Sequence, residues 1–509
     1  MGMLKNTLKF ASGTILSRLL GMIRDILMAS YYGSGVIAEA FFIAFRIPNL
    51  FRDMLAEGAL SQAFTKTYSQ QDSHAATNFL SKILAHLLVS GVVLSILGYF
   101  FAPLMVDWMT SFAGDSPAKL TMIAYAKKTS QLLFIMLPLM MIASVLMGAL
   151  TKQGNFFIAS LGSVFFNIGF IAGIVVIGPL FYRYIPDSFG FTAQVKTLLG
   201  LSCGVLGGCL LNVIIFAWSM RQKISLAKMR PVWTPEIKAT LLLMLPAAFA
   251  ASAGPINHVV NTNFATSLEL GSVSWLSYAF RLFHLPVGVF AVALSMAILP
   301  KVSVLVQKAP EQFIKHYEKA IVACVWIMGW MTVCTWFCAK DLVTLVFGRG
   351  SFSFVDIIMT ASALRFYAIG LIGYGLVKVL VTYYFAKERT STPFKIALLC
   401  VGINLGLNYY LVDYFQHSGM ALTASIVLSI NFILLLAGIM GDYPELFARI
   451  ARHVGSGLLM IFLAFLTGHF LSYFWVFPDS LPSMMESITR VMLFSLACTI
   501  VFILSLIHI

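Results

Sequence analysis

The chain alternates long apolar runs with short polar breaks. The runs are about 20 residues or longer, the length that a helix needs to cross a bilayer, whereas barrel strands would be about 10 residues of alternating polarity. Their number predicts about 14 transmembrane helices. The expected helix centres are Ile15, Phe45, Val92, Leu137, Phe170, Leu206, Ala248, Val289, Ile327, Ile369, Val401, Val427, Leu463 and Ala497.

Composition agrees with this pattern. Of the 509 residues, 60% are hydrophobic and 11% are charged, and the mean hydropathy is +0.90. Such values exclude a soluble globular domain and predict an all-α polytopic membrane protein.

The distribution of basic residues predicts the orientation. An even number of helices puts both termini on one side, and with the N-terminus inside, the cytoplasmic loops would hold about 18 Lys and Arg against about five outside. We therefore expect both termini in the cytoplasm. The net charge of +14 then reflects topology more than a nucleic-acid partner, which would need a basic domain that the short loops lack.

A weak internal repeat organises the chain. A shift of 235 residues places Ala44–Arg46 on Ala279–Arg281, and a shift of 237 places Asn167–Gly169 on Asn404–Gly406. Because six crossings separate the equivalent helices, the halves should have the same orientation, with a site between them near the membrane midplane. This architecture is typical of transporters.

The repeat predicts three parts. Residues 1–222 form an N-terminal lobe of six helices and the start of a cytoplasmic loop, residues 223–443 form a second lobe of six helices, and residues 444–509 form two additional C-terminal helices.

Eight ionisable residues lie in the first two predicted helices: Arg18, Arg24, Asp25, Glu39, Arg46, Arg52, Asp53 and Glu57. A charge at the centre of a membrane helix costs about 2.5–3.5 kcal/mol, so such residues normally face a water-filled cavity and serve function. The excess of arginine favours an anionic substrate. The planar guanidinium group binds phosphate oxygens bidentately, so a diphosphate is an obvious match.

Structural ion pairing is the main alternative for these charges. Arg18 and Asp25 are seven residues apart and so share a helix face, and Glu39, Arg46 and Asp53 repeat that spacing. Such pairing can coexist with function, because it would hold the arginines in place when the cavity is empty.

Prolines and glycines predict local features of the helices. Pro48 and Pro286 each remove a backbone hydrogen bond and can bend their helices. Gly204 and Gly208 form a GxxxG pair, which favours close contact with another helix.

Catalytic and metal-binding motifs are missing from the sequence. The seven cysteines lie in apolar runs without a C-x-x-C pair, and no H-E-x-x-H, G-x-S-x-G or G-x-x-x-x-G-K-[ST] string occurs. We therefore expect neither an enzyme nor a cofactor or metal.

Four segments resemble a known family. SRLLGMIRD at Ser17–Asp25 and EAFFIAFRIPNLFRDMLAEGALSQAF at Glu39–Phe64 are similar to the first two helices of the MurJ (MviN) lipid II flippases, members of the MOP exporter superfamily. GSVSWLSYAFRLFHLPVGVFAVALSMAILP at Gly271–Pro300 and VKVLVTYYFAKERTSTP at Val377–Pro393 resemble later helices of the same family.

The resemblance implies an inner-membrane protein that moves lipid II, the undecaprenyl-diphosphate-linked disaccharide pentapeptide, to the periplasmic leaflet for peptidoglycan synthesis. Its partners would be lipid II, membrane lipids and the cell-wall synthesis machinery. By motif position, the substrate-binding residues are Arg18, Arg24, Asn49, Arg52 and Arg281. The supporting charge network would comprise Asp25, Glu39, Arg46, Asp53 and Glu57. The last two helices, in residues 444–509, would help to form a groove for the lipid tail.

Three positions depart from the family pattern. Glu39 replaces the usual Asp, Phe280 replaces an acidic or amide residue, and His284 replaces a Glu or Gln. These changes leave the anion site intact but weaken any ion-coupling role at those positions. We expect His284 to be a neutral, hydrogen-bonded packing residue, although it could titrate near neutral pH.

Other functions stay open at this point. An O-antigen-type flippase or a MATE-like exporter would share the fold, and a cation exporter would want an acidic pocket. A polyprenyl-phosphate glycosyltransferase also needs arginines for diphosphate, but it would normally carry a carboxylate pair or metal-binding motif near a substantial loop, whereas the loops here are short and basic.

Overall fold

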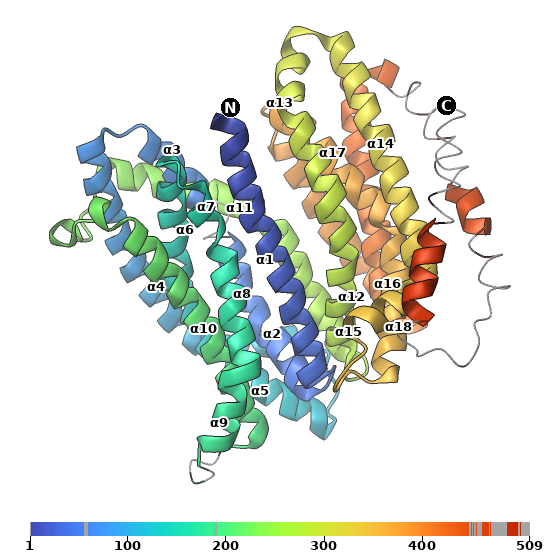
Figure 1. Ribbon diagram of the computed structural model, residues 1–509, viewed down its shortest axis with the longest axis horizontal. Coiled ribbons are helices and arrows are strands. Elements are labelled where there is room, and N and C mark those ends of the chain that lie inside the picture. The colour runs from blue at the N-terminus through green and yellow to red at the C-terminus, as the bar shows by residue number, and fades with distance from the viewer. Residues whose placement is uncertain are drawn as a thin grey trace. The chain divides into compact units, whose positions relative to one another are not determined.

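The computed structural model describes residues 2–54, 60–186, 188 and 191–446, and in the C-terminal part residues 449, 451, 455, 461–467, 469, 486–496 and 499. All regular elements of this described part are helical (Figure 1). The chain divides into two compact units, residues 1–273 and 274–509.

The first unit begins with the helices that carry the predicted site. Its elements are α1 (Gly2–Tyr32), α2 (Val36–Phe51), α3 (Ser61–Ser69), α4 (Ser73–Met109), α5 (Pro117–Leu133), α6 (Met136–Lys152), α7 (Phe156–Ser160), α8 (Gly162–Ala172), η2 (Gly173–Ile177), α9 (Gly178–Tyr184), α10 (Ala193–Ser219), η4 (Arg221–Lys223), η5 (Leu226–Lys228) and α11 (Pro235–Ser267). Within this unit α1 packs against α2 and α8 (Figure 1).

The second unit contains all but the first two residues of α12. Its elements are α12 (Ser272–Pro286), η6 (Val287–Ala291), α13 (Val292–Lys308), α14 (Pro310–Phe337), α15 (Ala339–Phe347), α16 (Phe354–Ile369), α17 (Leu371–Ala386) and α18 (Ser391–Asp442). The helix α18 is two helices joined across a kink, since Gln416 has φ 50° and ψ −135°.

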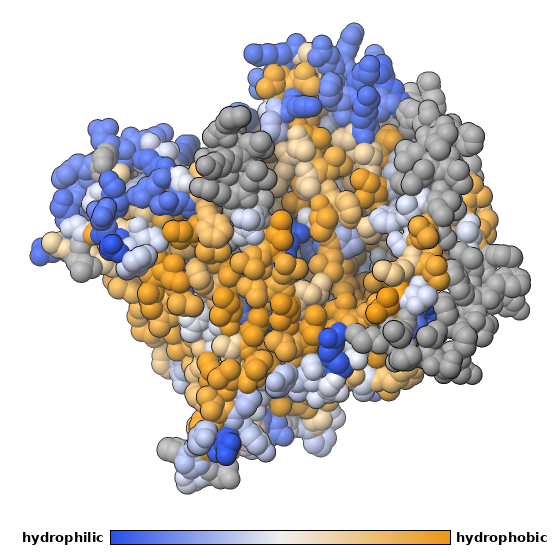
Figure 2. Space-filling model, viewed as in Figure 1, coloured by the Kyte–Doolittle hydropathy of each residue, from blue (hydrophilic) through white to orange (hydrophobic). Residues whose placement is uncertain are grey.

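The helices confirm an all-α polytopic membrane protein. Six described helical segments are long and apolar enough to cross a bilayer, or up to eight if the bent pairs α5–α6 and α16–α17 each count as one span. The first twelve predicted centres all fall in helical segments. The total of 14 stays a prediction, because the last centre, Ala497, lies outside the described residues. Figure 2 shows that, on the face drawn, hydrophobic residues cover the middle of the helices and hydrophilic residues gather near their ends.

Both predicted prolines precede a wide helical turn. Pro286 is the last residue of α12, and the π-helical turn η6 follows it directly. Pro48 lies inside α2, and residues 52–54 adopt π-helical geometry beyond its end. Each proline lacks an N–H group, so the regular hydrogen-bond ladder is interrupted there.

Glycines bring α8 and α10 into backbone contact, as the GxxxG pair predicted. A Cβ atom built on Gly204 would lie 2.3 Å from the Cα atom of Gly173, and one built on Gly169 would lie 2.3 Å from the Cα atom of Gly208. Only glycine permits such an approach. This close packing fixes α8, which also contacts α1.

The helix α11 belongs by its contacts to the first unit. The Thr240 hydroxyl donates to the Thr67 hydroxyl at 3.0 Å, and the Asn263 amide donates to the Trp108 carbonyl oxygen at 2.7 Å. The compact unit thus extends beyond residue 222, to Val273. A division into lobes by the order of membrane crossings stays a prediction.

Candidate functional site

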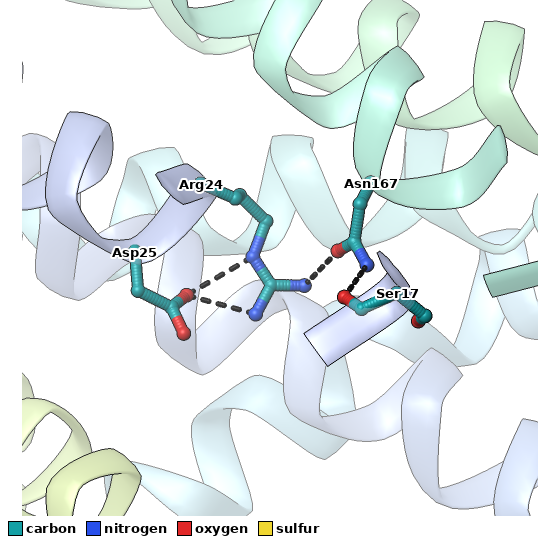
Figure 3. A network of polar contacts seen from close by, with 4 residues as sticks. All are labelled: Ser17, Arg24, Asp25 and Asn167. Atoms are coloured by element: carbon teal, nitrogen blue, oxygen red, sulfur yellow. Dashed lines mark hydrogen bonds and ion pairs between the residues drawn. The ribbon is translucent and has the colours of Figure 1, made fainter. Parts of the chain in front are cut away.

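Arg24 forms a buried network in the first unit. Its Nε and Nη2 atoms donate to the same carboxylate oxygen of Asp25 at 3.0 and 2.8 Å, and its Nη1 atom donates to the side-chain oxygen of Asn167 at 2.9 Å. Figure 3 shows the guanidinium group between these two partners. The side chains of Arg24 and Asp25 are only 9% and 11% exposed, so water screens this pair weakly.

Asn167 links α8 to α1. Its amide nitrogen donates to the Ser17 carbonyl oxygen at 3.1 Å, which leaves its oxygen directed at Arg24 (Figure 3). The residue is 5% exposed. One side chain therefore fixes both the packing of α1 on α8 and the direction of the arginine.

Arg52 repeats this arrangement at the end of α2. Its Nε and Nη2 atoms donate to one carboxylate oxygen of Asp53 at 3.2 and 2.9 Å, and the Asn49 amide donates to the other oxygen at 3.0 Å. The side chains of Arg52 and Asp53 are 18% and 33% exposed. This second pair is therefore more accessible than the first.

Two phenylalanines of α8 lie against the two arginines. The Arg24 guanidinium carbon is 5.1 Å from the centre of the Phe170 ring, and that of Arg52 is 5.8 Å from the Phe166 ring. Phe166 and Phe170 are one helical turn apart, so α8 presents both rings on one face. Each contact stabilises the cation by about 0.5–2 kcal/mol.

Glu39 occupies a different position from the arginine pairs. It is 3% exposed, and its Oε1 atom accepts the backbone N–H of Val273 at 2.8 Å. The longer side chain that replaces the family's usual Asp thus reaches a backbone donor at the end of the first unit.

Two of the aspartates form ion pairs, but with adjacent arginines and not with the residues seven positions away that the helix spacing predicted. Asp25 pairs with the adjacent Arg24 and not with Arg18, which is exposed and has no hydrogen bond or ion pair with another described residue. Asp53 pairs with the adjacent Arg52. Arg46 is half-buried on α2. Glu57 lies outside the described residues.

In the second unit, α12 carries Arg281 and the two remaining departures from the family pattern. Arg281 is exposed. The ring centres of Phe280 and His284 are 4.1 Å apart, and the His284 Nε2 atom lies 3.1 Å from the Tyr374 hydroxyl. His284 is therefore hydrogen-bonded and packed, as expected, while its titration near neutral pH stays a prediction.

The geometry suits reversible anion binding. In both arginines the Nε and Nη2 atoms, a pair of donors that can also bind a phosphate, donate to one oxygen of a neighbouring aspartate. An incoming phosphate can replace that carboxylate, which meanwhile holds the arginine in place. The sequence patterns did not predict that Asn167, Phe166 and Phe170 contact these arginines.

Solved structures identify the fold. A structure titled "Lipid II flippase MurJ, inward closed conformation" matches with a TM-score of 0.76 and 24% identity over 98% of this chain and 99% of that one. An inward-facing MATE multidrug transporter of the MOP superfamily matches with a TM-score of 0.66 and 17% identity over 87% of this chain and 98% of that one. The chain shares the fold of these two structures, and its long apolar helices define a multi-pass membrane protein.

Sequence comparison identifies the family. The family model described as "Lipid II flippase MurJ" matches residues 28–481. A probable lipid II flippase MurJ of Buchnera aphidicola (subsp. Acyrthosiphon pisum) is 32% identical over 451 residues, which cover 86% of this chain and 83% of the relative. One of Rhizobium meliloti is 31% identical over 487 residues, which cover 90% and 86%. The chain belongs to the lipid II flippase MurJ family.

Proposed function

We propose that this protein is a lipid II flippase. It moves the undecaprenyl-diphosphate-linked disaccharide pentapeptide from the cytoplasmic to the periplasmic leaflet. Membership of the family supports this function, and the observation that carries it is the pair of Arg–Asp contacts, Arg24 with Asp25 and Arg52 with Asp53, against the aromatic face of α8.

The substrate diphosphate exchanges with the two aspartates. When the headgroup enters, phosphate oxygens take the Nε–Nη2 edges, and when it leaves, the carboxylates return. Because the site is never left with a bare buried cation, the empty transporter avoids the full desolvation penalty of its arginines. Arg18, Asn49 and Arg281 complete the binding set in this proposal, with Glu39, Arg46 and Glu57 as supporting charges.

Transport proceeds by alternating access. The cavity opens first to the cytoplasm, where the headgroup binds, and then to the periplasm. The last two helices, in residues 444–509, hold the lipid tail in a groove.

The protein lies in the bacterial inner membrane with both termini in the cytoplasm. The basic residues of the loop between α10 and α11 support this orientation, since positive loops stay inside. They are Arg221, Lys223, Lys228 and Arg230.

Binding to purified protein in lipid nanodiscs tests the substrate class. We expect lipid II to bind the parent protein, and Arg24→Ala and Arg52→Ala to weaken binding strongly. Arg389→Ala is the matched control, because Arg389 also donates to an aspartate, Asp442, at 2.8 Å, but at an exposed helix end. Binding of cationic drugs in place of lipid II would instead favour a MATE-like exporter.

A further inference from the structure

A lysine lies within an apolar helix of the second unit. Lys378 is half-buried in the middle of α17, whose sequence is LIGYGLVKVLVTYYFA. Its Nζ atom is 5.1 Å from the centre of the Tyr374 ring, one turn earlier in the same helix. Among the described residues no carboxylate pairs with it and no acceptor receives a hydrogen bond from it.

The Lys378 side chain does not extend toward the end of α17, because its Nζ atom lies over the Tyr374 ring, one turn in the opposite direction. Eight residues, about 12 Å of helix, separate Lys378 from Ala386 at the end of α17. A lysine within an apolar helix that has no carboxylate partner among the described residues marks a substrate or ion pathway by default. The arginines of the first unit differ in this respect, because Arg24 and Arg52 each have an aspartate.

Tyr374 is held in place by His284. The His284 Nδ1 atom lies 3.3 Å from the Phe280 carbonyl oxygen, which can only accept, so Nδ1 carries the hydrogen. The Nε2 atom is hydrogen-bonded to the Tyr374 hydroxyl at 3.1 Å. Phe283 stacks on the same tyrosine with ring centres 5.7 Å apart.

This arrangement orients the ammonium group without neutralising it. The tyrosine ring attracts the cation through its π face, but neither the ring nor the imidazole supplies a negative charge. The three N–H donors of Lys378 are thus left for an anionic oxygen.

We propose that Lys378 is a second anion subsite for the transported headgroup, with Tyr374 and His284 as positioning residues. The subsite rests on the proposed function and takes an anionic oxygen of the headgroup. That oxygen belongs either to a carboxylate of the peptide or to the diphosphate.

Two ligands and three variants test the subsite. Lipid II and undecaprenyl diphosphate, which lacks the sugar and peptide, are titrated against protein in nanodiscs. Lys378→Met removes an intramembrane charge at similar length and so should fold, and Lys378→Arg restores the charge. Lys387→Gln is the matched control, because the Nζ atom of Lys387 also lies over a tyrosine ring, that of Tyr443 at 5.7 Å, but beyond the end of α17.

We expect Lys378→Met to weaken lipid II binding about 10- to 100-fold, Lys378→Arg to recover most of it, and Lys387→Gln to have no effect. A loss for lipid II alone identifies a peptide carboxylate, and an equal loss for both ligands identifies the diphosphate. Equal affinity of Lys378→Met and the parent for both ligands would overturn the subsite. If the parent itself bound neither ligand, the proposed function would fail instead.

A separate binding measurement tests whether Tyr374 positions Lys378. Tyr374→Phe keeps the ring under the ammonium group but loses the hydroxyl that His284 holds. It should weaken lipid II binding about threefold to tenfold in the parent and not at all in Lys378→Met. An equal loss in both backgrounds would show that Tyr374 does not act through Lys378.

Discussion

Asn167→Asp distinguishes an anion site from a cation site. The substitution is nearly isosteric and keeps an oxygen 2.9 Å from the Nη1 atom of Arg24. It adds one negative charge beside the guanidinium group and loses the donor to the Ser17 carbonyl oxygen. Asn167→Ala removes both hydrogen bonds without adding charge and is the matched control.

The expected magnitudes follow from the geometry. If a bound phosphate sits about 5–8 Å from the new carboxylate, an effective dielectric constant of about 20 gives a repulsion of about 2–3 kcal/mol per phosphate charge. This weakens binding about 30- to 160-fold. Asn167→Ala loses one hydrogen bond to a charged group, about 1.5–3 kcal/mol at most, and part of that loss is recovered when the phosphate satisfies Arg24.

Equilibrium binding of lipid II in nanodiscs measures this difference, with melting temperatures in detergent to verify that each variant folds. We expect the parent to bind most tightly, then Asn167→Ala, then Asn167→Asp. If Asn167→Asp bound lipid II as tightly as Asn167→Ala, a phosphate site at Arg24 would be wrong. Tighter binding of a cationic ligand by Asn167→Asp would favour a cation exporter.

Three further predictions concern bidentate binding by the arginines, the packing of α8 on α10 and alternating access. Lysine in place of Arg24, Arg52 or Arg281 keeps the charge but loses the paired hydrogen bonds, so the affinity for lipid II should fall about tenfold to a hundredfold. Normal growth and transport with all three variants would contradict bidentate binding. Gly204→Ala forces α8 and α10 apart and should destabilise the protein by about 1–3 kcal/mol. Gly207→Ala is the control, because a Cβ there meets no other atom within 4 Å, and it should leave the melting temperature unchanged. Equal melting temperatures of the two variants would refute close packing at Gly204. Cysteines at the inner-facing ends of the second and eighth predicted membrane helices should react with impermeant reagents to an extent that depends on substrate. One fixed pattern in all conditions would oppose alternating access.

The elements could be predicted because membrane helices follow from local hydrophobicity. The apolar runs gave the first twelve helix positions, and the prolines and the GxxxG pair marked wide turns and a close helix contact. These properties depend on short stretches of sequence and on the length that a bilayer requires.

The partners of the charges could not be predicted in the same way. Helix periodicity predicted pairs seven residues apart, yet Arg24 and Arg52 each pair with the aspartate that follows them in the sequence. Long arginine side chains are flexible, and residues of another helix, α8, fix their direction. Asn167 is 143 positions from Arg24, and the internal repeat had singled it out only as a match to Asn404. The fold alone reveals that it contacts the arginine.

A protein that carries lipid II across the membrane through its arginine site controls which leaflet holds lipid II. The most direct test is to deplete the protein from cells and measure which leaflet holds labelled lipid II. We expect lipid II to accumulate in the cytoplasmic leaflet. The parent and Arg389→Ala should restore its transfer, whereas Arg24→Ala and Arg52→Ala should not. An unchanged distribution of lipid II between the leaflets after depletion would contradict this function.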